Sequence, residues 1–299
     1  MTGSDLKVSV QSFVSDYLSA TDNNNLGPGT EEKAWEGFVL GFSQGDDKLY
    51  GFWKEHIGGF HWTPAEAFAL GTKADAQATG AASMARPDEE VPDASDLTVV
   101  SWAVSHTETT KADNRGQTKF PSERWARSRV YGQKLNRALH RALVASRASR
   151  GYSAVAPALL PDHGEKESES QGRSSNWSER HVAYTSGLGT FSLCGGLITE
   201  LGQAVRLGSV IVRARVPATV RPYSDPFEYC LYFQGIECTA CADRCPVGAM
   251  DGETRDKTVC GHHLEVTTAE FVQREFGFKG YGCGLCQTGV PCESGIPKR

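Results

Sequence analysis

The sequence predicts an α+β protein that ends in a cysteine-rich module. Apolar runs at residues 97–104, 153–159 and 209–216 resemble buried strands, and a long amphipathic helix lies between the first two. The apolar fraction of 39% and charged fraction of 22% are typical of a globular chain. Eight of the nine cysteines fall between Cys230 and Cys292. We therefore expect a mixed helical region (1–95) packing on the core, an α/β cofactor or substrate domain (96–225) and a metal-binding module (226–299).

The first 95 residues predict helices and loops. Apolar positions recur with helical spacing over residues 5–18, and a second helix is expected from about Glu31 to Phe42. Thr63 and Glu66 form a capping box around Pro64, which predicts a short helix through Ala69. Residues 74–95 predict a connecting loop.

The central region predicts strand, helix, strand. Residues 97–104 form a buried strand, and Ser122 caps a long helix that ends near Gly151, where glycine is an expected stop. Strands at 153–159 and 209–216 complete an α/β layer. The polar segment 161–180 cannot be core and is expected to be a disordered insertion or a mobile loop over a site.

Charge and hydropathy narrow the class of protein. The net charge of -5 argues against a chain built to coat nucleic acid. No run approaches the roughly 20 apolar residues of a membrane span, and the N-terminus lacks the basic and apolar regions of a secretory signal. We expect a cytoplasmic protein without a membrane partner. In that reducing compartment clustered thiols indicate metal ligation rather than disulfides.

The most specific motif is Cys238-x2-Cys241-x3-Cys245-Pro246. Bacterial two-cluster ferredoxins carry a similar motif in which the last cysteine binds the other 4Fe–4S cluster. The usual first cysteine is missing, so Cys230 is expected to replace it. Crossed ligation divides the eight cysteines into two sets of ligands. The first set is Cys230, Cys238, Cys241 and Cys292. The second set is Cys245, Cys260, Cys283 and Cys286.

Alternatives remain at these positions. The same thiols suit two zinc sites, although zinc ribbons favour paired C-x2-C knuckles. Cys292 follows Pro291 and departs from the usual spacing, so it is the ligand with the weakest motif support. Cys194 stands apart and is expected to be a small buried hydrophobe, and His262 and His263 are expected to be solvated.

Three further segments resemble a known superfamily: residues 176–189 (NWSERHVAYTSGLG), 196–202 (GLITELG) and 206–212 (RLGSVIV), followed by the cysteine module. This order is similar to that of cobalamin-dependent iron–sulfur reductases, namely epoxyqueuosine reductases and the core of reductive dehalogenases, over roughly residues 95–295. The resemblance implies a nitroreductase-like corrinoid-binding domain, a bacterial-ferredoxin-like domain with two 4Fe–4S clusters, and electron transfer to cobalt.

The resemblance also implies site residues. Residues Gly187, Leu188, Gly189 and Thr190 are expected near the corrinoid, since glycines permit close backbone approach to a flat ligand; a tight turn into the next strand explains them equally well. Tyr184, Glu179 and Arg180 are candidate catalytic residues, with Tyr184 a proton donor beside the Arg180 cation. Alternatively, Glu179 and Arg180 form a structural ion pair and Tyr184 packs in the core.

Departures from the family shape the functional hypothesis. The aspartate that donates a proton in epoxyqueuosine reductases has no counterpart near residues 173–176, and the chain ends seven residues after Cys292. Together with the acidic charge, these features predict that tRNA is not the substrate. The absence of a twin-arginine leader separates the chain from respiratory dehalogenases.

The long helix carries many cations and one acid, Glu123. Besides a solvated face, this pattern suits an acidic flavodoxin or ferredoxin donor or an anionic ligand; the cations are Arg124, Arg127, Arg129, Lys134, Arg137, Arg141, Arg147 and Arg150. The sequence thus predicts an oxidoreductase acting on a small molecule through two clusters and a corrinoid. The alternative is a non-catalytic electron-transfer protein that reduces a partner corrinoid protein.

Overall fold

The computed structural model describes residues 3–20, 22, 24–73, 82–84, 92–250, 252 and 255–298. A four-stranded antiparallel sheet forms the centre of the fold, with the strand order β1-β2-β8-β3. Its members are β1 (Trp35–Gln44), β2 (Leu97–His106), β8 (Val205–Arg213) and the short β3 (Ala154–Val155). The fold is therefore mixed α+β, as predicted, and the neighbouring strands of this sheet all pair antiparallel.

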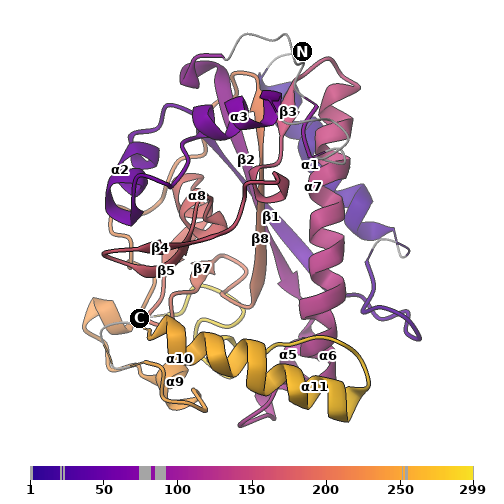
Figure 1. Cartoon of the computed structure of the whole chain (residues 1–299), viewed down its shortest axis with the longest axis vertical. Helices are drawn as coiled ribbons and strands as arrows, with labels where there is room; N and C mark the ends of the chain where they lie inside the picture. The colour runs from indigo at the N-terminus through magenta and orange to yellow at the C-terminus, as the bar shows by residue number, and fades with distance from the viewer. Residues whose placement is uncertain are drawn as a thin grey trace.

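Alternate residues of β2 serve two cores on opposite faces of the sheet. Val100, Trp102 and Val104 pack with α1 (Gly3–Ser19) and α7 (Gln133–Ala148), which lie together on one face. Leu97 and Val99 pack against α2 (Lys48–Ile57), α3 (Pro64–Lys73) and α8 (Glu179–Thr185) on the other face (Figure 1). Every residue of β2 is buried because both faces are covered.

Most of the predicted elements are confirmed. Helix α1 matches the predicted stripe, and α3 begins at a capping box in which Thr63 N–H donates to Glu66 Oε2 at 2.8 Å and Glu66 N–H to Thr63 Oγ1 at 3.3 Å. The Ser122 hydroxyl caps α6 (Glu123–Arg127), which continues through a π-helical turn into α7. The connecting loop expected over residues 74–95 lies largely outside the described residues.

Three local predictions are wrong. The helix expected over 31–42 is strand β1, which pairs with β2 from Trp35 to Gln44 around a bulge near Gly37. The strand expected over 153–159 shortens to β3, because Pro157 starts a 3-10 turn. The polar segment forms an ordered hairpin, β4 (Glu165–Ser168) and β5 (Gly172–Ser175), followed by α8.

The boundary proposed at residue 95 separates two neighbouring strands of one sheet, β1 and β2. Beyond residue 226 the described chain consists of loops and short helices, among them α9 (Ala240–Asp243), α10 (Lys257–His262) and α11 (Thr268–Phe276). These helices lie at one end of the molecule beside α6 and α5 (Glu108–Arg115) (Figure 1). No helix in the described ranges is long and apolar enough to cross a membrane.

Candidate functional site

The first set of cysteines lines a single narrow pocket. Cys230, Cys238, Cys241 and Cys292 surround about 20 Å³ of free space together with apolar side chains of the module. Cys230 and Cys241 are 7% and 9% exposed. Burial raises the pKa of the Cys292 thiol to about 12, and the neighbouring Cys194, Cys230 and Cys238 act in the same direction. The chain thus brings four thiols together from both ends of the module.

The second set is linked by electrostatic proximity. Burial raises the pKa of Cys283 to about 11, with added contributions from Cys260 and Cys245. Cys283 in turn contributes to the raised pKa of Cys286, whose largest cause is a hydrogen bond with Cys194. Within the described residues, no three His, Cys, Asp or Glu side chains converge closely enough to hold one metal ion.

Cys194 lies between the two sets rather than in a purely apolar setting. It is 1% exposed, and its Sγ is 3.3 Å from Ser192 Oγ and 3.4 Å from Gln203 Oε1. It also forms hydrogen bonds with Cys241 of the first set and Cys286 of the second. Cys194 is therefore buried in an apolar cluster with Leu193 and Ile198, as predicted, with polar contacts at its sulfur atom in addition.

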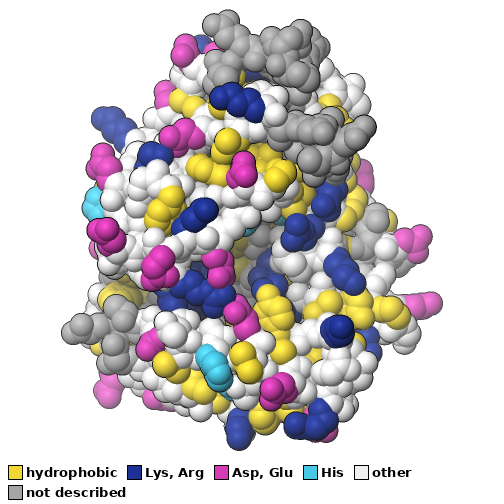
Figure 2. Space-filling model, in the orientation of Figure 1, with side chains coloured by type: hydrophobic (Ala, Val, Ile, Leu, Met, Phe, Trp, Pro, Cys, Tyr) yellow, Lys and Arg dark blue, Asp and Glu magenta, His cyan; other side chains and the backbone are white. Residues whose placement is uncertain are grey.

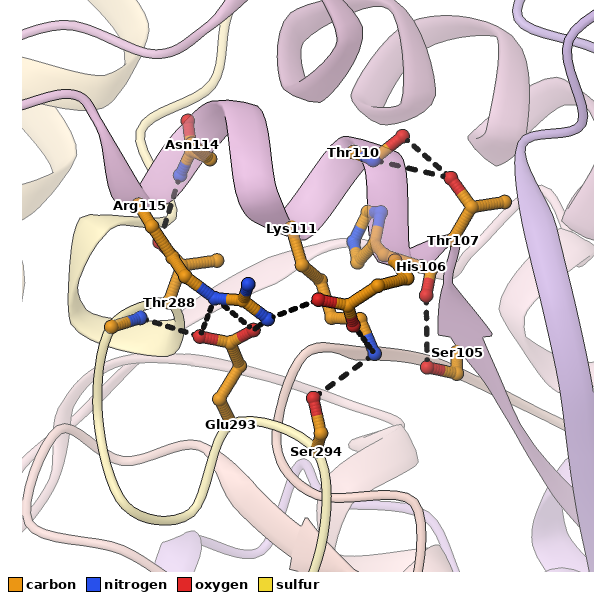
Figure 3. A network of polar contacts seen from close by, with 12 residues as sticks. Ser105, His106, Thr107, Thr110, Lys111, Asn114, Arg115, Thr288, Glu293 and Ser294 are labelled. Carbon is orange, nitrogen blue, oxygen red and sulfur yellow. Dashed lines mark hydrogen bonds and ion pairs between the residues drawn. The ribbon is translucent and has the colours of Figure 1, made fainter.

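A polar network fastens the loop that carries Cys292 to helix α5 (Figure 3). Arg115 binds the Glu293 carboxylate through Nε and Nη2, and Lys111 Nζ donates to Ser294 Oγ at 3.0 Å. The Glu293 side chain is 7% exposed. The backbone of the same loop accepts from Gln203 N–H at Cys292 O, 2.8 Å away. The loop that carries Cys292, the predicted ligand with the least motif support, is therefore attached both to α5 and to Gln203.

A larger cavity of about 870 Å³ lies beside the cysteine pocket. Its wall comes from the β4–β5 hairpin, from Arg180 on α8, from Phe227 and Phe233, and from α10. Figure 2 shows Lys and Arg side chains beside Asp and Glu side chains around a hollow between the hairpin and α10, and Glu165, Glu167 and Glu265 line the cavity. Ser192 and Leu193 line both this cavity and the cysteine pocket. The two spaces thus share a wall one or two side chains thick.

Among the catalytic candidates, only Arg180 lines this cavity. Tyr184 is 6% exposed and packs among Trp53, Phe191 and Tyr223. Burial raises the pKa of its phenol, which opposes the proton-donor role. The alternative of core packing describes Tyr184 better.

Glu179 and Arg180 do not pair with each other in the structure described. The Glu179 oxygens are enclosed, with Oε1 3.6 Å from His140 Nε2. That nitrogen also accepts from Ser209 N–H at 3.3 Å, and His140 Nδ1 lies 2.7 Å from Asn136 O. The structural ion pair considered from sequence is absent among the described contacts, and a catalytic role for Glu179 stays a prediction.

The glycines of residues 187–190 lie where the backbone turns and packs closely against a neighbouring strand. Gly187 turns at φ +83°, and strand β6 (Gly189–Phe191) begins two residues later against β7 (Leu197–Thr199). A Cβ at Gly189 would lie 2.0 Å from Ile198 O. Leu188 and Thr190 are buried, and neither belongs to the cavity wall. The alternative of a tight turn into a strand matches this geometry, and the corrinoid contact of residues 187–190 stays a prediction.

The basic helix uses many of its cations internally. Arg124 pairs with Glu32 and Asp113, and Arg127 pairs with Glu123. Arg129 donates to Tyr281 Oη at 2.6 Å, and Arg147 is fully buried. These contacts attach the helix to its neighbours, which accounts for much of the charge that suggested a docking face.

Sequence missed Arg255 and Lys257 as cavity residues. They lie far along the chain from Arg180, in the segment that precedes Cys260. Their only sequence signal was two cations within three positions next to a predicted ligand.

Comparisons with known proteins confirm the resemblance found in the sequence. Epoxyqueuosine reductases of Bacillus anthracis and Bacillus cereus are each 32% identical to the chain over 125 residues. That match covers 40% of this chain and only 30% of each relative. No family model matches the chain.

Solved structures show a distant likeness. An epoxyqueuosine reductase with an epoxyqueuosine-modified tRNA stem loop aligns with TM-score 0.48 and 18% identity, covering 100% of this chain and 68% of that one. A catabolic reductive dehalogenase in complex with 3-bromo-4-hydroxybenzoic acid aligns with TM-score 0.46 and 16% identity, covering 71% of this chain and 27% of that one.

These comparisons correct one prediction about partners. The sequence disfavoured tRNA as the substrate, yet the curated relatives are epoxyqueuosine reductases, and one solved epoxyqueuosine reductase carries a tRNA stem loop. The exclusion is wrong because it depended on a missing aspartate, the end of the chain and overall charge, none of which describes a local binding surface.

Proposed function

We propose that the protein is an iron–sulfur reductase similar to epoxyqueuosine reductases, in which two 4Fe–4S clusters deliver electrons to a corrinoid and its substrate in the large cavity. The observation that carries the proposal is the wall shared by the cysteine pocket and the cavity, formed by Ser192 and Leu193. A cluster bound by the first set would be separated from a cavity ligand by little more than these two residues. Short separation favours fast electron transfer, so the arrangement suits a redox enzyme.

The number and chemistry of the cysteines fit iron–sulfur clusters, and cluster binding would draw together thiols that do not converge on one metal ion among the described residues. Each predicted set supplies four thiols, which is the ligand number of a 4Fe–4S cube, and residues 226–299 would form the ferredoxin-like module. Binding would release the thiol protons, since the thiolate is the ligand. Cys194 would remain as a ninth thiol between the clusters.

The cavity fits a large cofactor. Its volume of about 870 Å³ is near the upper end of the range of roughly 300–1,000 Å³ for ligand sites. A bound corrinoid would supply a strongly reducing cobalt for cleaving a carbon–heteroatom bond. Phe227 and Leu193 would keep water from the cavity floor, and Arg180 would hold a negatively charged part of the ligand. The cavity also distinguishes this proposal from a simple electron carrier, which needs no ligand site.

Anaerobic reconstitution followed by gel filtration with cobalamin tests the proposal. We expect cobalamin to co-elute and its absorption spectrum to change after reduction with dithionite. Phe233→Ala, which alters the cavity wall, should weaken co-elution, whereas Val220→Ala, at an 85% exposed position, should not. Clusters that form while cobalamin elutes separately would identify an electron-transfer protein instead.

Single-turnover assays then separate the substrate classes. One arm offers small organohalides and epoxides, and the other offers an epoxyqueuosine-modified tRNA stem loop. Product in either arm supports a reductase and assigns its substrate class; cobalamin-loaded, reduced protein that converts neither would contradict the proposed chemistry.

A further inference from the structure

Three cations on the cavity wall lack a carboxylate partner among the described residues. They are Arg180 on α8, Arg255 just before α10, and Lys257 at the start of α10. Lys257 Nζ donates to the Gln171 carbonyl at 2.7 Å, and no ion pair involves any of the three within the described ranges. Arg255 lies over Gly195, and its enclosed Nε has no hydrogen-bond partner there.

Another cation in the same cavity shows what a structural role looks like. Arg173 binds Glu165 at 2.6 Å and Glu265 at 2.7 Å, linking the hairpin to the cysteine module. Arg173, which joins two segments of the fold, thus has a carboxylate partner on each of them. Of the other three, Lys257 reaches the hairpin only through the Gln171 carbonyl, and none of them forms such an ion pair within the described residues.

The three cations also repel one another. Arg180 is exposed to the cavity, where desolvation by the surrounding wall lowers its pKa and the Arg255 guanidinium lowers it further, while nearby thiols at Cys194, Cys286 and Cys260 oppose this effect. Burial lowers the pKa of Lys257 as well, followed by Arg180 and Arg255, while Glu167 acts in the opposite direction. Three like charges on one cavity wall repel one another; Glu167, which lines the same cavity, offsets part of this at Lys257, and a bound anion would offset more.

We propose that Arg180, Arg255 and Lys257 form a phosphate-binding site within the cavity, which takes a phosphate group of the cavity's ligand. Two guanidinium groups can form paired hydrogen bonds with phosphate oxygens, and the ammonium adds a compact charge. This inference deepens the proposed function and rests on it only in treating the cavity as the ligand site. The phosphate belongs either to the substrate or to the nucleotide tail of a corrinoid.

Titration calorimetry with inorganic phosphate and pyrophosphate, on cluster-loaded protein without corrinoid, tests the site. Wild type should bind these anions, and Arg180→Gln and Arg255→Gln should each weaken binding about tenfold or more, as expected for loss of a charge-assisted contact. Arg255→Lys, which keeps the charge, should retain part of the affinity. Lys166→Gln is the matched control, because Lys166 lines the same cavity on β4 outside the trio.

Two results would overturn the proposal. One is wild-type protein that takes up no phosphate or pyrophosphate. The other is an Arg255→Gln variant that binds phosphate and pyrophosphate as tightly as wild type does. If that variant also shifts the midpoint potential of a cluster, the cations serve the clusters instead. Iron content and circular dichroism of each variant identify any that fail to fold, and Arg255→Lys then provides the comparison.

Competition assigns the source of the phosphate. Cobinamide lacks the nucleotide tail of cobalamin, so phosphate that displaces cobalamin but not cobinamide locates the tail phosphate at this site. Phosphate that binds alongside both corrinoids assigns the site to the substrate. Failure of the proposed function is separately visible as phosphate binding without uptake of either corrinoid.

Discussion

Arg115 and Glu293 join helix α5 to the loop that carries Cys292. The Glu293 carboxylate accepts from Arg115 Nε at 2.9 and 3.0 Å and from Nη2 at 2.5 Å. It also accepts from Gly289 N–H across the base of the loop. One buried carboxylate thus holds the last predicted cluster ligand against a helix that lies more than 170 residues earlier.

Glu293→Gln should destabilise the protein because it removes the charge that Arg115 binds in a largely buried position. We expect the free energy of unfolding to fall by about 1–3 kcal/mol, the usual range for hydrogen bonds to charged groups. Urea denaturation of reconstituted protein measures the change. Glu108→Gln is the control, since Glu108 also binds Arg115 but its side chain is 60% exposed, and it should change stability by less than about 1 kcal/mol. Equal losses in the two variants would contradict the importance of burial at Glu293.

Cys292→Ala should remove one cluster. The crossed assignment predicts about four irons per chain in this variant, compared with about eight in wild type. Cys194→Ala should keep about eight, because Cys194 lies between the two sets and belongs to neither. Iron and sulfide analysis after identical anaerobic reconstitution compares them. Loss of iron from Cys194→Ala with none from Cys292→Ala would reassign the ligand.

Gly189→Ala should destabilise the protein even without a cofactor. The added methyl group would meet Ile198 O at 2.0 Å, so the β6–β7 pair must move apart. We expect a loss of about 1–3 kcal/mol, as for other overpacked cores, measured by thermal or urea unfolding. A variant as stable as wild type that no longer binds cobalamin would instead support a cofactor contact for the glycine.

Acid should destabilise the protein in part through His106. This residue is 2% exposed between Trp35 and Trp125, and burial holds its pKa well below its ordinary value, helped by Arg206, Lys111 and Arg129. Below about pH 6.5 the unfolded chain takes up a proton that the folded chain does not, so stability falls as pH decreases, by up to about 1.4 kcal/mol per pH unit. Urea unfolding at pH 7 and pH 5.5 measures the slope. His106→Gln should flatten it, and an unchanged slope would show that other groups carry the effect.

The sequence was sufficient for elements with strong local signals. The capping box at Thr63, the Ser122 cap and the continuous apolar run of β2 each depend on neighbouring residues, so they could be read directly. Strand β1 was missed because its apolar positions also suit a helix, and pairing with β2, more than 50 residues away, decides its structure. The antiparallel strand order was hidden for the same reason.

In the candidate site, too, features with a local sequence signal were predicted and features that depend on tertiary contacts were not. The four cysteines of the first set line one pocket, as their spacing suggests, while the assignment of both sets as cluster ligands stays a prediction. Arg180 was found through a family motif, but its neighbours Arg255 and Lys257 were not, since tertiary folding alone brings these segments to one wall. Conversely, the glycines suggested a ligand where the structure has close-packed backbone.

Metal analysis of anaerobically reconstituted wild-type protein tests the central claim most directly. Two 4Fe–4S clusters predict about eight irons and eight sulfides per chain, with a broad absorption near ~400 nm that dithionite bleaches. Zinc bound at these cysteines in place of iron, with no such absorption, would contradict the electron path on which the proposed function depends.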